Sequence, residues 1–409
     1  MTPPAPSTHP AAPDAAGSPR AGYVHLHLHS EYSLLDGGNR IPELVAKVKE
    51  LGMDAVALTD HGNLFGAVGF YQECKKQGIR PILGIEAYVA PDGVPDPEEN
   101  GRLVESDRHR KKMLGVADGG FHLVLLAENE TGWHHLLQLT SDSYREGFYF
   151  RPRMDKGTLT QWSEGLIAIN GHLGSSIAHH LRLFDRTGSK EHWERARAEA
   201  LWHAGLFGPN EHGEPRFYLE LQRHGTEEQE AVNGHILTLA EELSLPLVCD
   251  NDSHFLTAED WDAHDTLICI STGKHKSDEQ RLHYPQDLYV KSPEQMIELF
   301  ADVPEALENT RKIADRCHVD LDFSANHAPL VGIRRRDAET SAGPRSDGVS
   351  ASTLSGGPPP SSEAAELPLG RADTPHVSAE TSPHPPTHSS EPNDLRAGQT
   401  DTPNVSAET

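Results

Sequence analysis

The stretch YVHLHLHS at residues 23–30 opens the part of the chain that is expected to fold. Successive side chains of a β-strand point to opposite faces, so Val24, Leu26 and Leu28 would share one face and the interleaved histidines the other. The apolar face can pack on a layer of helices, and the imidazole face offers metal ligands at one strand end. One pair of histidines is weak evidence, but strands that end in a metal-binding side chain recur along the chain. The leading interpretation is therefore a hydrolase that holds several metal ions.

Strand-like and helix-like segments alternate from residue 21 to about residue 333. Repeated strand–helix units imply an α/β fold with a parallel sheet and right-handed crossovers. Seven strands with candidate ligands near their ends favour a closed barrel, with the site at the carboxyl ends of the strands, over an open doubly wound sheet. A surface excursion is predicted at 91–120, and the remainder after residue 249 is predicted to be helical with short strands to about residue 318. Helices are predicted at about 42–51, 66–77, 133–145 and 228–243, and strands at 23–29, 54–59, 81–90, 121–127, 166–170, 217–221 and 245–249.

The two ends of the chain have a composition that does not build a core. From about Arg334 onward there is no Phe, Trp or Tyr, and Pro, Ser, Thr, Gly and Ala dominate. Such a segment cannot bury enough apolar surface to offset the entropy lost on ordering. Its short repeat at 373–381 and 401–409 is too widely spaced for a solenoid. We expect a disordered extension at 1–20, one folded domain at 21–333, and a disordered C-terminal tail at 334–409.

The charge and the cysteines narrow the class of protein. A net charge of −26 does not indicate a protein built mainly to bind phosphate backbones. It fits a site whose carboxylates hold cations, or a protein that contacts nucleic acid partly through other segments. The four cysteines form no CxxC pair, which is typical of reduced thiols in a cytosolic protein. No run of about eighteen apolar residues exists, so no membrane span is predicted and the cytoplasm is the expected compartment.

Candidate ligands lie at or just beyond the predicted strands. Six imidazoles and three carboxylates suit Zn²⁺, Mn²⁺ or Fe²⁺ better than Ca²⁺ or a thiolate site. Nine ligands exceed the needs of one ion, so a cluster of two or three ions bridged by carboxylates is expected, and such clusters hydrolyse phosphoesters. The predicted metal ligands, which are also the predicted catalytic residues, are His27, His29, Asp36, His61, Glu86, His122, His172, Asp252 and His254.

Each of these residues also has an ordinary explanation. His61 could cap a helix, Glu86 could be a buried carboxylate in an ion pair, His122 could be a core histidine, and residues 252–254 could begin a helix. The joint occurrence of all nine at strand ends makes the metal cluster the better explanation. His25 lies further from the strand end and is interpreted as a neighbour of the site and not as a ligand.

Five motifs follow one another in the order of the polymerase and histidinol phosphatase (PHP) domain. They are HLHLHSEYSLLDG, TDHGNLFGAVGFYQECKKQGIRPILGIEAYV, FHLVLLAENETG, EGFYFRPRMDKGTL and NDSHF. The resemblance covers about residues 21–319. The second and fourth motifs are similar to the form of this domain found at the amino end of bacterial DNA polymerase III alpha subunits.

The resemblance implies a distorted (β/α)7 barrel with a trinuclear metal site. The ligand pattern of the family falls on all nine candidates. His172 stands where many relatives hold Cys, and His is an equally good zinc ligand. The implied cofactors are two to three ions of Zn²⁺ or Mn²⁺, with Fe²⁺ or Mg²⁺ as further candidates. The intact set implies metal-dependent 3′→5′ exonuclease activity, a proofreading role in DNA replication.

The implied partners are DNA 3′ ends and the rest of a polymerase. In the family, palm, thumb, fingers and clamp-binding regions follow the PHP domain, whereas this chain continues into its low-complexity tail. We expect an amino-terminal portion from a split, truncated or frameshifted gene. Such a portion would not polymerise alone and would meet the sliding clamp through a core on a separate or downstream polypeptide. Two other functions stay open: a structural module that braces a polymerase core, and a phosphomonoesterase such as histidinol phosphatase.

Overall fold

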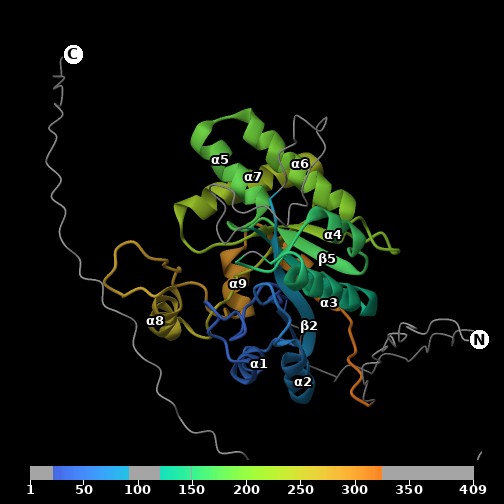
Figure 1. The fold of residues 1–409 in the computed structure, drawn as a ribbon, viewed down its shortest axis with the longest axis vertical. Coiled ribbons are helices and arrows are strands. Elements are labelled where there is room, and N and C mark those ends of the chain that lie inside the picture. Colours follow the sequence, from blue (N-terminus) through green and yellow to red (C-terminus); the bar gives the residue numbers. More distant parts are fainter. Residues whose placement is uncertain (1–21, 92–119, 149, 325–409) are drawn as a thin grey trace, which may run out of the picture. The chain divides into compact units, whose positions relative to one another are not determined.

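The structure is a computed structural model that describes residues 22–91, 120–148 and 150–324 (Figure 1). The predicted extension at 1–20, the predicted tail at 334–409 and all but the end residues of the predicted excursion at 91–120 lie outside these described residues. Within them, no helix is both long and apolar enough to cross a membrane.

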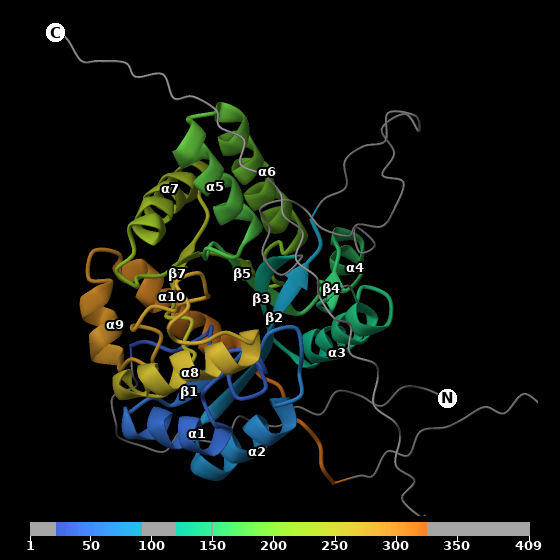
Figure 2. The same ribbon diagram turned by 60° about the vertical axis from the view of Figure 1, so that its left-hand side comes forward.

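One sheet forms the centre of the fold, and helices surround it (Figures 1 and 2). The short strand β4 (Arg153–Met154) lies beside the end of β2. The predicted strand positions are confirmed to within two residues for all six strands of the main path. In sheet order these strands are β1 (Ala55–Leu58), β2 (Arg80–Val89), β3 (Phe121–Ala127), β5 (Leu166–Asn170), β6 (Phe217–Leu221) and β7 (Leu247–Cys249).

Residues 23–29 close this sheet into a barrel. On one side, the amide of Ala57 in β1 donates to the carbonyl of His25 at 2.8 Å. On the other side, Leu28 forms a parallel bridge with Ser253, just beyond β7, and the amide of His29 donates to the Ser253 carbonyl at 2.9 Å. The six strands of the main path and residues 23–29 therefore form a closed ring of seven segments, which is the predicted barrel and not an open sheet.

The closing segment is not the regular strand that its sequence predicts. The amide of Leu26 donates to Asp250 Oδ2 at 2.6 Å and the amide of Leu28 donates to Thr59 Oγ1 at 2.9 Å. These amides bond to side chains, so they do not form a continuous ladder with the neighbouring backbones. The predicted sharing of one face is also wrong in part, because Leu26 joins a different apolar cluster from Leu28.

The sheet is mixed, which corrects the expectation of a parallel sheet. β3 runs antiparallel to both β2 and β5, whereas β1–β2, β5–β6 and β6–β7 are parallel. A parallel neighbour requires a crossover connection, usually a helix, whereas an antiparallel neighbour does not. No helix occurs in the described residues between β2 and β3. The beginning of β3 therefore lies at the same end of the barrel as the carboxyl ends of the other strands.

Local signals explain where several helices begin and end. Proline follows the first residue of α1 (Ile41–Glu50), where its missing amide hydrogen is not needed. Gly78 ends α2 (Ala67–Gln77) in the left-handed conformation, and Asn129 caps α3 (Glu130–Arg145). The other helices are α4 (Lys156–Gln161), α5 (Ser176–Thr187), α6 (Lys190–Leu206), α7 (Glu227–Leu243), the 3₁₀ turn η4 (Ala258–Asp260), α8 (Trp261–Thr272), α9 (Pro293–Leu299) and α10 (Pro304–Arg316).

Helix α10 covers the barrel end at which the parallel strands begin. Asn309 donates to the carbonyl of Leu247, the first residue of β7, at 2.8 Å. Thr310 Oγ1 accepts from the amide of Val24 at 3.1 Å. Side chains of α10 join the apolar cluster inside the barrel, which contains Val24, Leu26, Ala55, Ala57, Ile82, Val124, Leu126, Ile167, Ile169, Tyr218, Val248, Ile313, Ala314 and Cys317. This end is therefore packed, and a polar site is left to the opposite end.

Candidate metal centre

The strands and the loops after them carry the candidate ligands to one end of the barrel. Glu86 lies in β2 and is bridged to His61, which follows β1. Because β3 is antiparallel, its second residue His122 pairs with Tyr88 near the end of β2. Position in the strand alone would have placed His122 at the wrong end of a parallel barrel, and the reversal of β3 brings it to the cluster.

The buried carboxylate of Glu86 lies at the centre of the cluster, where it meets five imidazoles. Its oxygens lie 2.5 to 3.4 Å from ring nitrogens of His27, His29, His61, His122 and His172. Imidazoles of this number around one carboxylate do not form an ordinary ion pair, which would use a single cation. The arrangement is that of a carboxylate which would hold metal ions together with these imidazoles.

Two further carboxylates complete the set of nine. Asp252 Oδ1 lies 3.2 Å from His27 Nε2, 3.1 Å from His29 Nε2 and 3.6 Å from His254 Nδ1. The backbone of Asp252 has a φ of +50°, a left-handed conformation that Asp tolerates better than most residues and that is common at functional sites. Asp36 Oδ2 lies 3.4 Å from His61 Nε2. The structure thus brings together all nine residues predicted from the sequence.

The ordinary explanations for two of these positions are wrong. The residue that caps α2 is Gly66, so His61 does not cap that helix. The first helical turn after 252–254 is η4, and its capping residue is Thr257. His25 stands apart, as predicted: its ring nitrogens lie 2.9 Å from the Lys291 carbonyl and 3.1 Å from the Tyr23 hydroxyl.

The cluster leaves buried polar atoms without hydrogen bonds, which tests whether metal ions fit. Buried groups without partners are rare in folded proteins, so a group of them in one place needs an explanation. Four sets of three side chains also bring their ligand atoms within 4.8 Å of one another: His29, His61 and His254; His27, His29 and Asp252; His61, Glu86 and His122; and His27, His172 and Glu220. The atoms without hydrogen bonds include Nε2 of His27, His29, His172 and His254, Oδ1 of Asp36 and Asp252, and Oε2 of Glu86 and Glu220. The donor set fits Zn²⁺ or Mn²⁺.

The imidazoles titrate differently according to their neighbours. Burial favours the neutral ring, yet Asp252 and Glu220 hold the pKa of His27 well above its ordinary value. Burial, together with His61 and His254, lowers the pKa of His29 to about 3. His27 is therefore a positively charged imidazolium in the metal-free site, and a metal ion would have to displace a proton from it.

The carboxylates remain ionised despite their burial. Burial disfavours the charged form, but His122 and His61 hold the pKa of Glu86 well below its ordinary range. Burial likewise disfavours the charged form of Glu220, but His27 and His172 outweigh it and lower the pKa of Glu220 to about 2. Buried negative charge of this kind requires cations, whether protonated imidazoles or metal ions.

Glu220 is the residue that the sequence analysis missed. Its carboxylate is fully buried in β6, with Oε1 2.9 Å from His27 Nδ1 and Oε2 3.3 Å from His172 Nδ1. Gln222 Nε2 donates to the same Oε1 at 2.8 Å. A carboxylate on the far nitrogen fixes the tautomer and orientation of a metal-binding histidine. The available signal was a glutamate inside the apolar strand FYLEL, two residues from Tyr218 of the inner cluster.

Further contacts hold the segments that carry His29 and His172. Asp60 accepts hydrogen bonds from the Ser30 amide at 2.7 Å and from the Ser33 hydroxyl at 2.7 Å. Ser33 Oγ also lies 3.0 Å from His29 Nδ1, so it orients that ring. Gly171 has a φ of +151°, and a Cβ there would lie 2.6 Å from the Glu220 carbonyl. Only glycine lets the loop that carries His172 approach β6 this closely.

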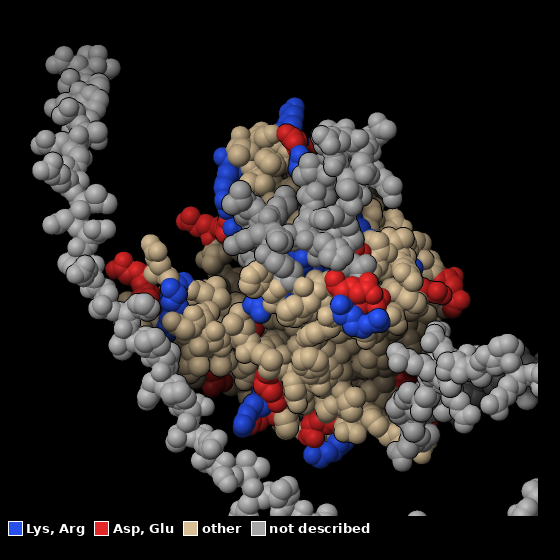
Figure 3. Space-filling model, in the orientation of Figure 1, with Lys and Arg blue, Asp and Glu red and all other residues tan. Residues whose placement is uncertain are grey.

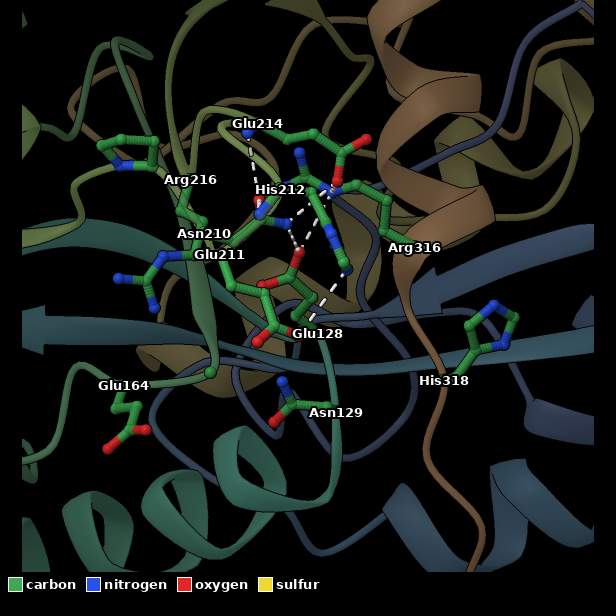
Figure 4. Close-up of a pocket in the computed structure, with 12 residues that line it drawn as sticks. Glu128, Asn129, Glu164, Asn210, Glu211, His212, Glu214, Arg216, Arg316 and His318 are labelled. Carbon is green, nitrogen blue, oxygen red and sulfur yellow. Dashed lines mark hydrogen bonds and ion pairs between the residues drawn. The ribbon is translucent and has the colours of Figure 1, made fainter. Parts of the chain in front are cut away.

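A polar cavity lies at the other end of the barrel, and Figure 4 shows the residues that line it. It has a volume of about 620 Å³ and is lined by Glu128, which directly follows β3, together with Asn210 and Arg316. Asn210 Nδ2 donates to Glu128 Oε1 at 2.9 Å, and Arg316 Nε lies 3.2 Å from the same oxygen. Asn210 and Arg316 thus both pair with the Glu128 carboxylate at this end.

Comparison with known proteins gives one family and a set of close relatives. The PHP domain family matches residues 25–224. The DNA polymerase III subunit alpha of Borreliella burgdorferi is 46% identical over 299 residues, which cover 73% of this chain and 24% of the relative. The protein of the same name from Campylobacter jejuni subsp. jejuni is 42% identical over 322 residues, covering 78% and 25%. The chain therefore spans about a quarter of the length of these curated relatives.

A solved structure that resembles this chain does so only distantly. A two-domain protein from Bacteroides vulgatus, containing a predicted PHP-like metal-dependent phosphoesterase, covers 78% of this chain and has 78% of its own length covered. Its TM-score is 0.33 and its sequence identity 13%. Likeness at this level says nothing about ligands or activity.

Proposed function

Residues 25–224 of this chain belong to the PHP domain family, and on this premise we propose that the chain is a metal-dependent phosphoesterase that removes nucleotides from DNA 3′ ends. The observation that carries the proposal is the convergence of nine ligand-type side chains, with buried nitrogens and oxygens that form no hydrogen bond, at one end of the barrel. A barrel that served only as a brace and held no metal would have no need of so many buried polar atoms without hydrogen bonds.

The residues of the chain have separable roles in this proposal. His27, His29, Asp36, His61, Glu86, His122, His172, Asp252 and His254 would hold two to three ions of Zn²⁺ or Mn²⁺. Such ions, when bound, neutralise phosphate charge, activate water and stabilise a leaving oxygen. Glu220 acts behind them by fixing the rings of His27 and His172 through Nδ1.

The exposure of the ligands indicates where a substrate would enter. The side chains of His27 and His29 are fully buried, whereas those of His61, His122 and Asp252 are 13%, 15% and 18% exposed. A phosphodiester would therefore reach the cluster past these three residues.

Tyr284 donates its hydroxyl to Asp36 Oδ2 at 2.9 Å. Burial and the Asp36 charge raise the pKa of Tyr284 well above its ordinary value, so Tyr284 holds that carboxylate as a neutral donor.

The proposal extends to DNA replication through the relatives. Those with 46% and 42% identity are named as subunits of DNA polymerase III. We accordingly propose that the 3′ ends are those made by a replicative polymerase, that the partner is a polymerase core, and that the sliding clamp is met through that core. The activity would be proofreading.

The test is nuclease activity of the full purified chain. A 5′-labelled single-stranded oligodeoxynucleotide incubated with Mn²⁺ or Zn²⁺ should be shortened stepwise from its 3′ end. His61→Ala and Glu86→Gln should abolish this shortening, because both residues belong to the cluster. His212→Ala is the matched control, since His212 is 73% exposed and its ring lies beside Glu211, outside the cluster.

Each other outcome selects a different function. Equal rates in the wild type and both cluster variants would show that a contaminating nuclease causes the shortening. Metal-dependent turnover of a phosphomonoester without any action on DNA would identify a small-molecule phosphatase. Two to three bound ions per chain without turnover of either substrate would identify a structural module.

A further inference from the structure

We propose that a group of exposed aromatic rings beside the metal cluster is a stacking surface for the unpaired bases of single-stranded DNA. This inference rests on the proposed nuclease function and adds the chemical class of its substrate. We call the rings of Tyr32, Phe65, Tyr144, Phe148 and Phe150 the aromatic rim.

The aromatic rim is continuous with the cluster. A cavity of about 180 Å³ is lined by all five rings of the rim and also by His61 and Tyr88. His61 lies 13% exposed at the edge of the cluster, and its ring centroid is 6.1 Å from that of Tyr88 in a stacked arrangement. Tyr88 in turn meets His122 edge to face at 5.0 Å. A strand whose terminal phosphate reaches the cluster would thus lay its bases against the rim.

The rings of the rim extend one another across three elements. The centroid of Phe65, which precedes α2, lies 6.0 Å from that of Tyr144 in α3. Tyr144 lies 6.2 Å from Phe148, in the segment between α3 and β4. The spacing of these centroids lies within the range for interacting aromatic pairs. A row of this kind can receive successive bases of one strand.

The exposure of these rings is not explained by the packing of the barrel. Their exposed fractions run from 37% for Tyr32 to 76% for Phe150. Among the residues that the structure describes, five of the six exposed Phe and Tyr side chains line this one cavity, and Phe323 is the sixth. Apolar side chains exposed together next to a site usually mark a binding surface.

The backbone at Phe150 supports a role in binding. Its φ is +58°, a left-handed conformation that is unfavourable for a bulky residue. The side chain is 76% exposed, so burial does not compensate for this strain. Backbone strain of this kind recurs at ligand-binding sites.

Charge near the rim suits a polynucleotide. The guanidinium of Arg151 lies 5.8 Å from the centroid of Tyr88 and also lines the cavity. Arg145, at the end of α3, has a side chain that is 70% exposed. On the face drawn in Figure 3, basic and acidic side chains stand beside one another in small groups, so the net charge of −26 is not gathered into one acidic surface there. Aromatic rings with nearby arginines are the usual equipment for single strands.

Single-stranded DNA is favoured over the other phosphoesters that a metal cluster could accept. The bases of a duplex are stacked on one another and do not offer their faces to a protein. A small phosphomonoester without a base has nothing to place on five rings. A single strand with unpaired bases at its 3′ end uses both the rim and the cluster.

The experiment measures binding of the full chain without cleavage. The probe is a 5′-fluorescein-labelled oligodeoxyadenylate whose 3′-terminal linkages are phosphorothioates, followed by fluorescence anisotropy in Mn²⁺. A second probe has the same backbone with abasic residues at its 3′ end. Phe65→Ala and Phe148→Ala should each weaken binding of the first probe roughly 5- to 150-fold, the range for loss of one stacked base. The abasic probe should bind the wild type as weakly as the variants do.

Controls separate stacking from damage to the fold. Phe148→Leu removes the ring and keeps apolar volume, so it should weaken binding as Phe148→Ala does. Phe323→Ala removes an exposed ring that packs near Tyr71 instead of the cavity, and it should bind as the wild type does. Circular dichroism and thermal unfolding of each variant report whether the fold is kept.

The outcomes separate this inference from the proposed function. Unchanged affinity in folded Phe65→Ala and Phe148→Leu would overturn the stacking surface, even if the chain were an active nuclease. If the variants bound the abasic probe more weakly than the wild type by the same factor as the first probe, the rings would not act on bases and the inference would be overturned as well. If the same variants instead lost a polymerase core on copurification, the rim would be a protein contact. Ring-dependent binding in a chain that cleaves no DNA would keep the stacking surface and reject the nuclease.

Discussion

Glu220→Gln tests whether the buried carboxylate behind the cluster orients its ligands. In the structure, the two oxygens of Glu220 serve two rings, with His27 Nδ1 at 2.9 Å and His172 Nδ1 at 3.3 Å. Glutamine has the same size but replaces one oxygen by an NH₂ group, which cannot accept a hydrogen bond. One of the two imidazoles therefore loses its acceptor, and the tautomer that presents Nε2 to a metal ion is no longer favoured.

The expected loss is 10- to 100-fold in metal affinity, or about 1.4 to 2.7 kcal/mol, the usual effect of removing a partner behind a metal-binding histidine. Glu86→Gln should have a larger effect, because Glu86 contacts five imidazoles and would itself hold the metal. The matched control is Glu228→Gln in α7, whose carboxylate pairs with Arg182 at the surface.

The assay is competition for Zn²⁺ between the protein and a chromophoric chelator at fixed pH, with the bound metal counted by elemental analysis. A second readout is the titration of His172 by NMR in the metal-free protein. Burial favours the neutral ring, but the adjacent carboxylates of Glu220 and Glu86 outweigh it and raise the pKa of His172 to about 9, and this pKa should fall in the variant. Affinity within twofold of the wild type, together with an unchanged His172 titration, would refute the orienting role.

Two further predictions concern the metal and the pH. Chelation of the metal should lower the free energy of unfolding by about 2.7 kcal/mol relative to protein with free metal at 100 times its dissociation constant, and the Tm of a folded domain of this size by about 4 °C. Calorimetry in EDTA, then in restored Zn²⁺, measures this shift, and an unchanged Tm would count against the cluster. In the metal-free protein, His27 and His172 outweigh burial and lower the pKa of Glu220 to about 2, against about 4.3 when unfolded, so its contribution to stability is present above about pH 4.3 and is lost as the pH falls towards 2. His172 has the opposite sign: its contribution is complete below about pH 6.5 and is lost as the pH rises towards 9. Urea unfolding across pH 2 to 10 should show both flanks, and Glu220→Gln should flatten them.

The convergence of the nine candidate ligands could be predicted because the signal lies within single strands and the loops after them. The strand at 121–127 matches β3 residue for residue, and those at 166–170 and 217–221 match β5 and β6. The direction of β3 could not be predicted in the same way. A hydrophobic period of two is identical when read in either direction, and the path between β2 and β3 decides the direction.

Two other features depend on contacts between distant segments. In FYLEL every side chain is buried, so the sequence does not reveal that Glu220 faces inward and not towards a helix. The irregular shape of residues 23–29 arises because Asp250 and Thr59, far along the chain, take up the amides of Leu26 and Leu28. The clustering of the aromatic rim likewise joins residues from several loops. Spacing within one segment contains no information about any of these contacts.

The closure of the barrel by residues 23–29 has a consequence for how the protein folds. The hydrogen bond from His29 to Ser253 joins residues 224 positions apart, and loop closure over such a distance is slow. On the ribosome the first segment cannot find its neighbour until residue 253 has been made, so the ring would be sealed late. Because the same seven residues supply His27 and His29, the site would mature only with this last step. The time at which a refolding chain takes up metal would then report when residues 23–29 close the ring.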